Sequence, residues 1–311
     1  MPEAHAASQV GGLAAAAGLD LHQGFGAPAR LGCVPHLARS YLTHTTLSAL
    51  AADPFSPREI ALRVEALGVR KTQLPLIPTM VLGVLGGAFI AFGAMLYTAI
   101  VTDSALGAGP TRLLGGAAFS LGLLLVVVAG AELFTGNNLI AMAWASGKVS
   151  TRQMLRNWGL VYLANFAGAL GAAMLMWLAD GLLVGGEPVR ATAIEIARIK
   201  LGLDPMTAFA RGVLCNILVC LAVWLCFAAR DLAGKLLAIL PPVSAFVALG
   251  FEHSVANMYL IPVAWLAGAE GITLSAFAAN LAAVTLGNIL GGSGLVALVY
   301  WLCYLRDYPA P

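Results

Sequence analysis

The chain has 311 residues, of which 60% are hydrophobic and only 10% carry a charge, and its mean hydropathy is +0.87. This composition excludes an ordinary soluble domain and indicates an all-α integral membrane protein. The formal net charge of +2, with its lysines and arginines spread through loops, argues against a nucleic-acid partner.

The first 52 residues form a segment of their own, rich in Ala, Gly and His and without a clear period. No cationic stretch precedes its GGLAAAAGL run, so the segment does not resemble a secretory signal. We predict a low-complexity, disordered extension over residues 1–52.

A surface helix is predicted for residues 53–75. The tetrapeptide Ser-Pro-Arg-Glu at 56–59 supplies an N-cap, a proline at the first helical position and a capping-box acid. Ile60, Val64 and Leu67 then fall on one helical face. We expect an amphipathic helix on the cytoplasmic surface.

The region 76–306 holds six long apolar segments. Two of them, residues 113–145 and 236–268, are 33 residues long and as continuous helices would reach roughly 50 Å, against a hydrocarbon core of about 30 Å. Each must therefore break, tilt strongly or fold back. The other four have ordinary spanning length: 78–101, 158–178, 209–229 and 281–305.

Both overlong segments carry the same polar pair. Glu132 is followed five residues later by Asn137, and Glu252 and Asn257 repeat this pair 120 positions further on. Polar groups and irregular backbone at bilayer depth are tolerated only inside protein or beside a cavity. We predict breaks at 132–138 and 250–257, with these four side chains capping backbone groups freed there.

A second repeat supports duplication of the segments. Asn157, Val161, Asn165 and Gly168 recur 123 positions later as Asn280, Val284, Asn288 and Gly291. Six elements thus divide into two sets of three, each with a broken middle member. Because three is odd, the second set enters from the opposite side, which predicts an inverted repeat with a central site.

Cationic residues predict the orientation. Ten lysines and arginines flank one membrane face and five flank the other. Because positive charge favours the cytoplasm, we expect both termini there, in a multi-pass protein of the inner (plasma) membrane with a short tail at 307–311.

Three strings resemble a known family. They are GAELFTGNNLIAMAWASGKVS, RGVLCNILVCLAVW and GFEHSVANMYLIP, and they resemble the formate/nitrite transporter family of pentameric, aquaporin-like channels for small monovalent anions. The resemblance covers residues 56–306 and implies a homopentamer in the lipid bilayer.

The resemblance also implies roles for single residues. His253 matches the central pore histidine, and Thr135 matches the polar residue in the loop of the broken second segment. Asn216 matches a pore-facing asparagine, and Lys200 matches a lysine near the outer vestibule. Two hydrophobic constrictions above and below the histidine are matched by Phe119, Leu123, Leu133 and Phe246.

His253 is also singled out by the residues alone. The other four histidines lie in the first 52 residues, and a lone histidine in an apolar region is usually a packing residue. Its position in the break of an overlong segment instead favours a pore role. A carboxylate such as formate could take up a proton there, cross as the neutral acid and lose the proton beyond.

The predicted function is therefore a channel or transporter for small monovalent anions, formate first, with a proton as partner. Nitrite and hydrosulfide stay open as substrates. A water or glycerol channel is disfavoured because no Asn-Pro-Ala motif occurs at the breaks, and an ammonium channel because a second pore histidine is missing. No His-Glu-x-x-His or Gly-x-Ser-x-Gly motif suggests an enzyme, and neither cofactor nor metal is expected.

Overall fold

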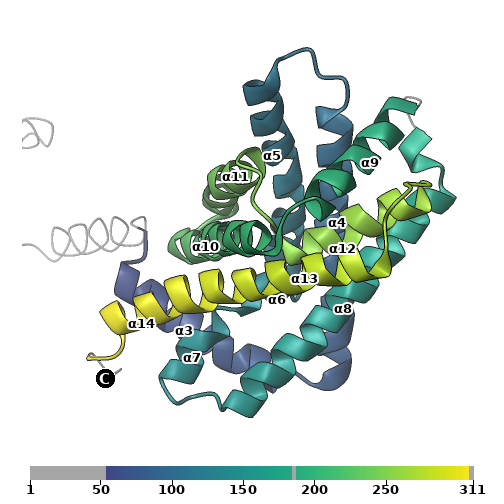
Figure 1. The fold of residues 1–311 in the computed structure, drawn as a ribbon. Helices are drawn as coiled ribbons and strands as arrows, with labels where there is room; N and C mark the ends of the chain where they lie inside the picture. Colours follow the sequence, from purple (N-terminus) through teal and green to yellow (C-terminus); the bar gives the residue numbers. More distant parts are fainter. Residues whose placement is uncertain (1–53, 184–186, 308–311) are drawn as a thin grey trace, which may run out of the picture. The chain divides into compact units, whose positions relative to one another are not determined.

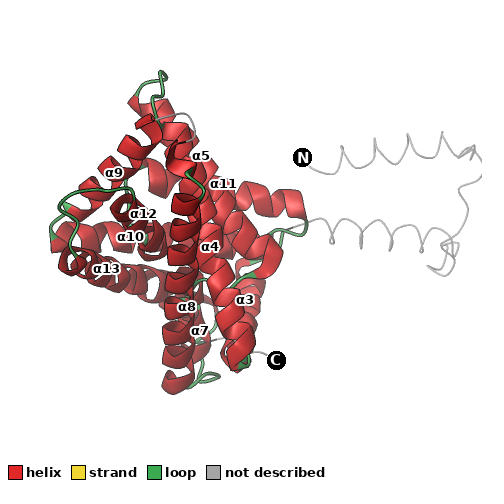
Figure 2. Ribbon diagram, turned by 90° about the vertical axis from the view of Figure 1, so that its right-hand side faces the viewer, coloured by secondary structure: helices red, strands yellow, loops and turns green. Residues whose placement is uncertain are grey.

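The computed structural model describes residues 54–183 and 187–307, so the predicted extension at 1–52 lies outside the described residues. Every regular element in the described part is helical, as predicted (Figure 2). Within these described residues, five helical stretches are long and apolar enough to cross a membrane: Leu76–Val101, Ala108–Gly130, Thr151–Leu178, Pro205–Ala228 and Leu274–Tyr304.

Helix α3 (Pro57–Gln73) begins with the predicted capping box. The Ser56 side chain accepts from the Glu59 N–H, while the Glu59 carboxylate accepts from the Ser56 N–H at 2.8 Å. Further along, the buried Glu65 pairs with Lys148, which lies just after α7. This ion pair holds α3 beside α7, where Figure 1 also draws it.

Helices α4 (Leu76–Val101) and α8 (Thr151–Leu178) approach closely at glycines of α4. A Cβ on Gly83 would lie 2.5 Å from Ala164 Cβ, and a Cβ on Gly87 would collide with the backbone of α8. The absence of side chains therefore sets the helix spacing, since small residues let membrane helices approach closely.

Helices α10 (Pro205–Ala228) and α13 (Leu274–Ile289) repeat this arrangement. Cβ atoms on Gly287 and Gly291 would collide with carbonyl oxygens of α10. The last span continues without interruption through a π-helical stretch, η3 (Leu290–Leu298), into α14 (Val299–Tyr304).

The first overlong segment is interrupted. Helix α5 (Ala108–Leu125) passes into a π-helical turn, η1 (Val126–Gly130), which ends at Gly130 with φ 84°. Two short helices follow, α6 (Phe134–Asn137) and α7 (Ile140–Ala145). The break thus begins slightly earlier than predicted, because the left-handed Gly130 ends the helix before Glu132.

The second overlong segment is interrupted as well. Helix α11 (Leu232–Ala248) ends near Gly250, whose φ is 70°, and α12 (Ser254–Leu266) starts just after His253. The break is shorter than the predicted 250–257, since Asn257 already lies inside α12.

Helix α9 (Glu187–Leu201) was absent from the sequence-based expectation. Its apolar positions alternate with Arg, Glu and Lys, and it is too short to span a bilayer, so hydropathy gave no signal. The helix packs against α12, which brings Lys200 near its end to the second break.

Candidate functional site

A polar network fills the first break. The Asn137 Nδ2 donates to Glu132 Oε2 at 2.7 Å and to Asn157 Oδ1 at 2.9 Å. The Lys71 ammonium, from the end of α3, pairs with the other Glu132 oxygen. Asn157 in turn donates to the Lys71 carbonyl at 3.2 Å. Each of the four residues is therefore bonded to two of the others.

The second break contains the same network built from other residues. The Asn257 Nδ2 donates to Glu252 Oε2 at 2.7 Å and to Asn280 Oδ1 at 2.9 Å. The Lys200 ammonium lies 3.0 and 3.1 Å from the two Glu252 oxygens, and Asn280 donates to the Lys200 carbonyl at 3.0 Å.

The predicted capping of backbone groups by these side chains is wrong. Across the described residues, no backbone N–H donates to the carboxylate of Glu132 or Glu252, and the amides of Asn137 and Asn257 donate to side chains. A buried carboxylate is costly unless a cation neutralises it. Each glutamate therefore pairs with a nearby lysine rather than with backbone N–H groups at the helix end.

Two other asparagines satisfy the freed backbone. The Asn165 Oδ1 accepts from the Phe134 N–H at 2.9 Å, and its Nδ2 donates to the carbonyls of Gly83 and Glu132 at 2.7 and 2.8 Å. An amide can do this because it carries both donors and an acceptor without charge.

Asn288 does the same at the second break. It accepts from the Ser254 N–H at 2.9 Å and donates to the carbonyls of Gly212 and Glu252 at 2.8 and 3.0 Å. Asn165 and Asn288 belong to the repeat at offset 123, so that sequence signal could have identified both.

His253 and Thr135 meet between the two breaks. Both side chains are buried, and the His253 Nε2 lies 2.9 Å from the Thr135 hydroxyl oxygen. The other ring nitrogen, Nδ1, accepts the Ala256 N–H at 3.0 Å and so caps α12. Because Nδ1 is an acceptor, the proton of the neutral ring is assigned to Nε2, which donates to Thr135.

Asn216 joins this centre from α10. Its Nδ2 lies 3.2 Å from the Thr135 carbonyl, 2.9 Å from Asn138 Oδ1 and 2.7 Å from the Asn288 carbonyl, and these three acceptors share its two hydrogens. Three acceptors around one nitrogen fix the orientation of the amide. Asn216 therefore contacts the backbone carbonyl of Thr135 rather than its hydroxyl, and none of its hydrogen bonds in the described residues reaches the His253 ring.

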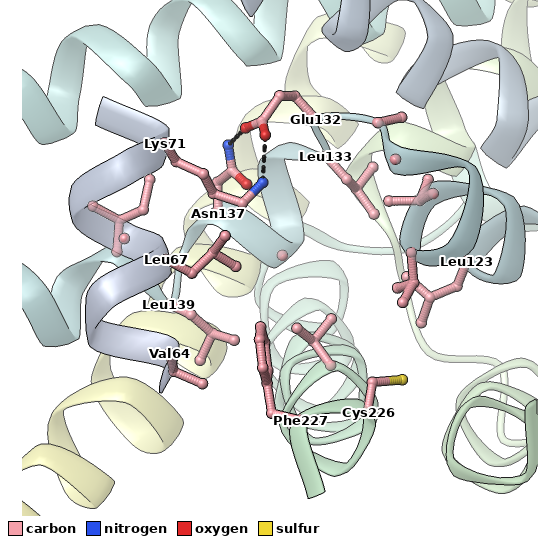
Figure 3. A pocket seen from close by; sticks show the side chains of 18 of the residues that line it. Val64, Leu67, Lys71, Leu123, Glu132, Leu133, Asn137, Leu139, Cys226 and Phe227 are labelled. Carbon is pink, nitrogen blue, oxygen red and sulfur yellow. Dashed lines mark hydrogen bonds and ion pairs between the residues drawn. The ribbon is translucent and has the colours of Figure 1, made fainter. Parts of the chain in front are cut away.

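Two cavities adjoin the breaks, and each is lined by a lysine and glutamate pair; His253 lines the second of them. The Lys71 vestibule, of about 430 Å³, is lined by Lys71 and Glu132, with Leu123 and Leu133 among its apolar residues. Figure 3 shows the bonds of Glu132 with Lys71 and Asn137 at one end of it.

The Lys200 vestibule, of about 130 Å³, is lined by Lys200, Glu252 and His253 together with aromatic residues. Phe246 stacks on His253 with ring centroids 6.0 Å apart, and Phe119 packs edge-on against Phe246 at 5.7 Å. The four residues matched to constrictions are thus all buried and divide equally between the two vestibules.

Comparison with known sequences gives the family. The sequence model described as formate/nitrite transporter matches residues 58–302. The chain belongs to the formate/nitrite transporter family. Within it, a probable formate transporter of Methanothermobacter thermautotrophicus is 41% identical over 271 residues, which cover 81% of this chain and 98% of the relative. The formate channel FocA of Escherichia coli K12 is 37% identical over 279 residues, with 83% and 98% covered.

Solved structures of the formate/nitrite transporter family agree with the fold. A pentameric formate channel with formate bound is 39% identical, with a TM-score of 0.69, and the match covers 74% of this chain and 98% of that chain. An ion channel of the family is 31% identical, with a TM-score of 0.73 and coverages of 78% and 98%. The prediction of a membrane transport protein rather than an enzyme is therefore confirmed.

Proposed function

We propose that this protein is a homopentameric channel for formate and similar small monovalent carboxylates. The support comes from relatives named as formate channels or transporters and from a structural neighbour that is pentameric with formate bound. These names favour formate over the nitrite and hydrosulfide alternatives. The excess of cationic residues on the α3 side supports two cytoplasmic termini in the plasma membrane.

The two halves of the chain are proposed to form an inverted repeat, with three spans in each half. The support is that hydrogen bonds in the first half have counterparts in the second half; it does not rest on a superposition of helices. The networks around Glu132 and Glu252 join corresponding residues, although Lys71 contacts one carboxylate oxygen and Lys200 contacts two, and the bonds of Asn165 and Asn288 correspond as well. Such a repeat places a substrate site at the interface of its halves.

The proposed path runs from the Lys71 vestibule, past Leu133, to the His253 and Thr135 pair and on to the Lys200 vestibule. The support is this buried polar pair, together with one cavity lined by His253 and Lys200 and another lined by Leu133 and Lys71. A bare anion would cross the apolar parts at great cost, so formate takes up a proton from water in one vestibule, crosses as the neutral acid and returns the proton to water in the other.

His253 is proposed to act as a neutral ring during transport. A second proton would have to sit on Nδ1, where it would face the Ala256 N–H and remove the cap of α12. The ring instead donates from Nε2 to Thr135, which leaves the hydroxyl hydrogen of Thr135 available to a passing substrate. In this proposal His253 orients Thr135 and stores no proton.

Flux measurements test the proposed function. Proteoliposomes containing the protein should take up labelled formate faster than empty liposomes, and unlabelled formate should compete better than nitrite, hydrosulfide or lactate. The absence of formate uptake by folded protein would refute the proposal, and stronger competition by nitrite would reassign the substrate.

A further inference from the structure

The Lys200 vestibule contains a second cation beside the lysine. Of the described residues that line this cavity, Lys200 and Arg211 are cationic and Glu252 is the acidic one. The Lys200 ammonium contacts both Glu252 oxygens, and their side chains are only 13% and 4% exposed. This pair is neutral as a unit, so the net positive charge of the cavity resides on Arg211.

The Arg211 guanidinium lies at the second break. Its Nη1 donates to the Gly250 carbonyl at 3.3 Å, while its own backbone carbonyl accepts from the Glu252 N–H at 3.3 Å. No ion pair of Arg211 occurs in the described part of the chain. Gly250 has no side chain, and even an added Cβ would be 3.8 Å from Nη1, so the guanidinium is not crowded there.

The chemistry of this group suits a carboxylate. A guanidinium carries five N–H donors in a planar fork that matches the two oxygens of a carboxylate. In the described structure one N–H of Arg211 donates to the Gly250 carbonyl. The other N–H groups of the guanidinium can therefore bind an anion. Beyond it the same cavity is lined by Phe119 and Phe246, where the bare anion becomes costly.

The Lys71 vestibule provides a natural comparison. There the Leu82 carbonyl accepts from the Glu132 N–H at 3.1 Å, as the Arg211 carbonyl does for Glu252. Leu82 lines the Lys71 vestibule, as Arg211 lines the Lys200 vestibule. The matched position therefore carries an apolar side chain in the first vestibule and a guanidinium in the second. The hydrogen-bonded framework does not need an arginine at this position.

We propose that Arg211 forms a capture subsite for small monovalent carboxylates in the Lys200 vestibule, and that Lys200 serves mainly to neutralise Glu252. This inference rests on the proposed formate transport and refines the role that the family resemblance implies for Lys200. The subsite concentrates formate before the neutral acid crosses the apolar part of the path.

The test measures initial formate uptake against formate concentration in proteoliposomes. Arg211→Gln should raise the half-saturating concentration roughly threefold to tenfold with little change in the maximal rate, since one charged, forked contact is lost. Arg211→Lys should give a smaller rise, because the charge stays and the fork is lost. Arg198→Gln is the matched control: Arg198 is exposed on α9 and lies outside the cavity lining.

The outcomes separate the two proposals. If the parent protein takes up no formate, the proposed function fails. If the parent transports and Arg211→Gln keeps its half-saturation, or if Arg198→Gln raises it equally, the subsite alone is overturned. Should Arg211→Gln not fold, Arg211→Lys decides, and an unchanged half-saturation in that variant refutes the forked contact.

Discussion

The two interrupted segments share one framework and differ in what they place on it. In both, a glutamate, a lysine and two asparagines form the same closed network, and a third asparagine holds the freed backbone. At matched positions in the breaks, the first segment has Leu133 and Thr135 where the second has His253 and Val255. The repeated residues therefore hold the two breaks, and in the proposed function the residues that differ supply the chemistry of the path.

The largest expected effect tests whether the two frameworks are equivalent. Asn165→Leu and Asn288→Leu should each prevent recovery of a folded protein or lower its melting temperature strongly. Each removes three buried hydrogen bonds and leaves backbone groups unsatisfied, at a cost of about 1–3 kcal/mol for each group. Thermal unfolding in detergent measures this, and a variant that melts like the parent would show that one break does not need its asparagine.

A somewhat smaller effect is expected from the lysines. Lys71→Met and Lys200→Met leave a buried carboxylate unpaired, which typically costs about 3–5 kcal/mol when no other group compensates. The asparagine bond to each glutamate should soften this loss. The double variants Lys71→Met/Glu132→Gln and Lys200→Met/Glu252→Gln remove both charges and should recover much of the melting temperature. If the double variants are no more stable than the single ones, neutralisation is not the role of the lysines.

The constriction residues should change selectivity more than stability. Phe246→Ala removes the ring that stacks on His253 in the Lys200 vestibule, so it should widen the path and admit larger carboxylates. Leu133→Ala is the comparison on the Lys71 side. Uptake of formate, acetate and lactate measures discrimination, and a Phe246→Ala variant that discriminates like the parent would argue against a constriction at that ring.

The smallest effect concerns the start of α3. Lowering the pH should loosen the capping box at Ser56 and Glu59, because hydrogen bonds from Ser56 hold the pKa of the Glu59 carboxyl below its usual 4.5. A depressed pKa means that this contribution is present above the unfolded pKa and is lost as the pH falls through the folded one. Hydrogen exchange of the first turn of α3 near pH 4 against pH 7 would reveal it, with Ser56→Ala as the variant that should no longer respond.

The sequence predicted the fold well because its strongest signals are local or repeated. Overlong apolar segments require breaks, and the offsets of 120 and 123 mark the asparagines that hold them. The ion pairs were missed because Lys71 and Glu132 are 61 residues apart and nothing local couples them. Helix α9 was missed because it is too short to span a bilayer and charged residues interrupt its apolar ones in the sequence, and with it the pairing of Lys200 was lost.

The contact of His253 with Thr135 joins residues 118 positions apart, so no pattern in the sequence predicts it, and the family resemblance implied a role for each residue but not their contact. The capping of α12 by the same ring was not anticipated at all. Histidine is not among the residues that commonly cap helices, so its role as a cap is recognised only when the backbone geometry is known.

The most direct test of the account is the pH dependence of formate flux in the parent, Thr135→Val and His253→Asn. An asparagine can still cap α12 through its carbonyl oxygen but has no second ring nitrogen for Thr135. We expect formate flux of the parent to rise as the external pH falls. Both variants should fold, and their flux should be lower than that of the parent by about tenfold or more at every pH. Parental flux from folded His253→Asn across the pH range would contradict the account.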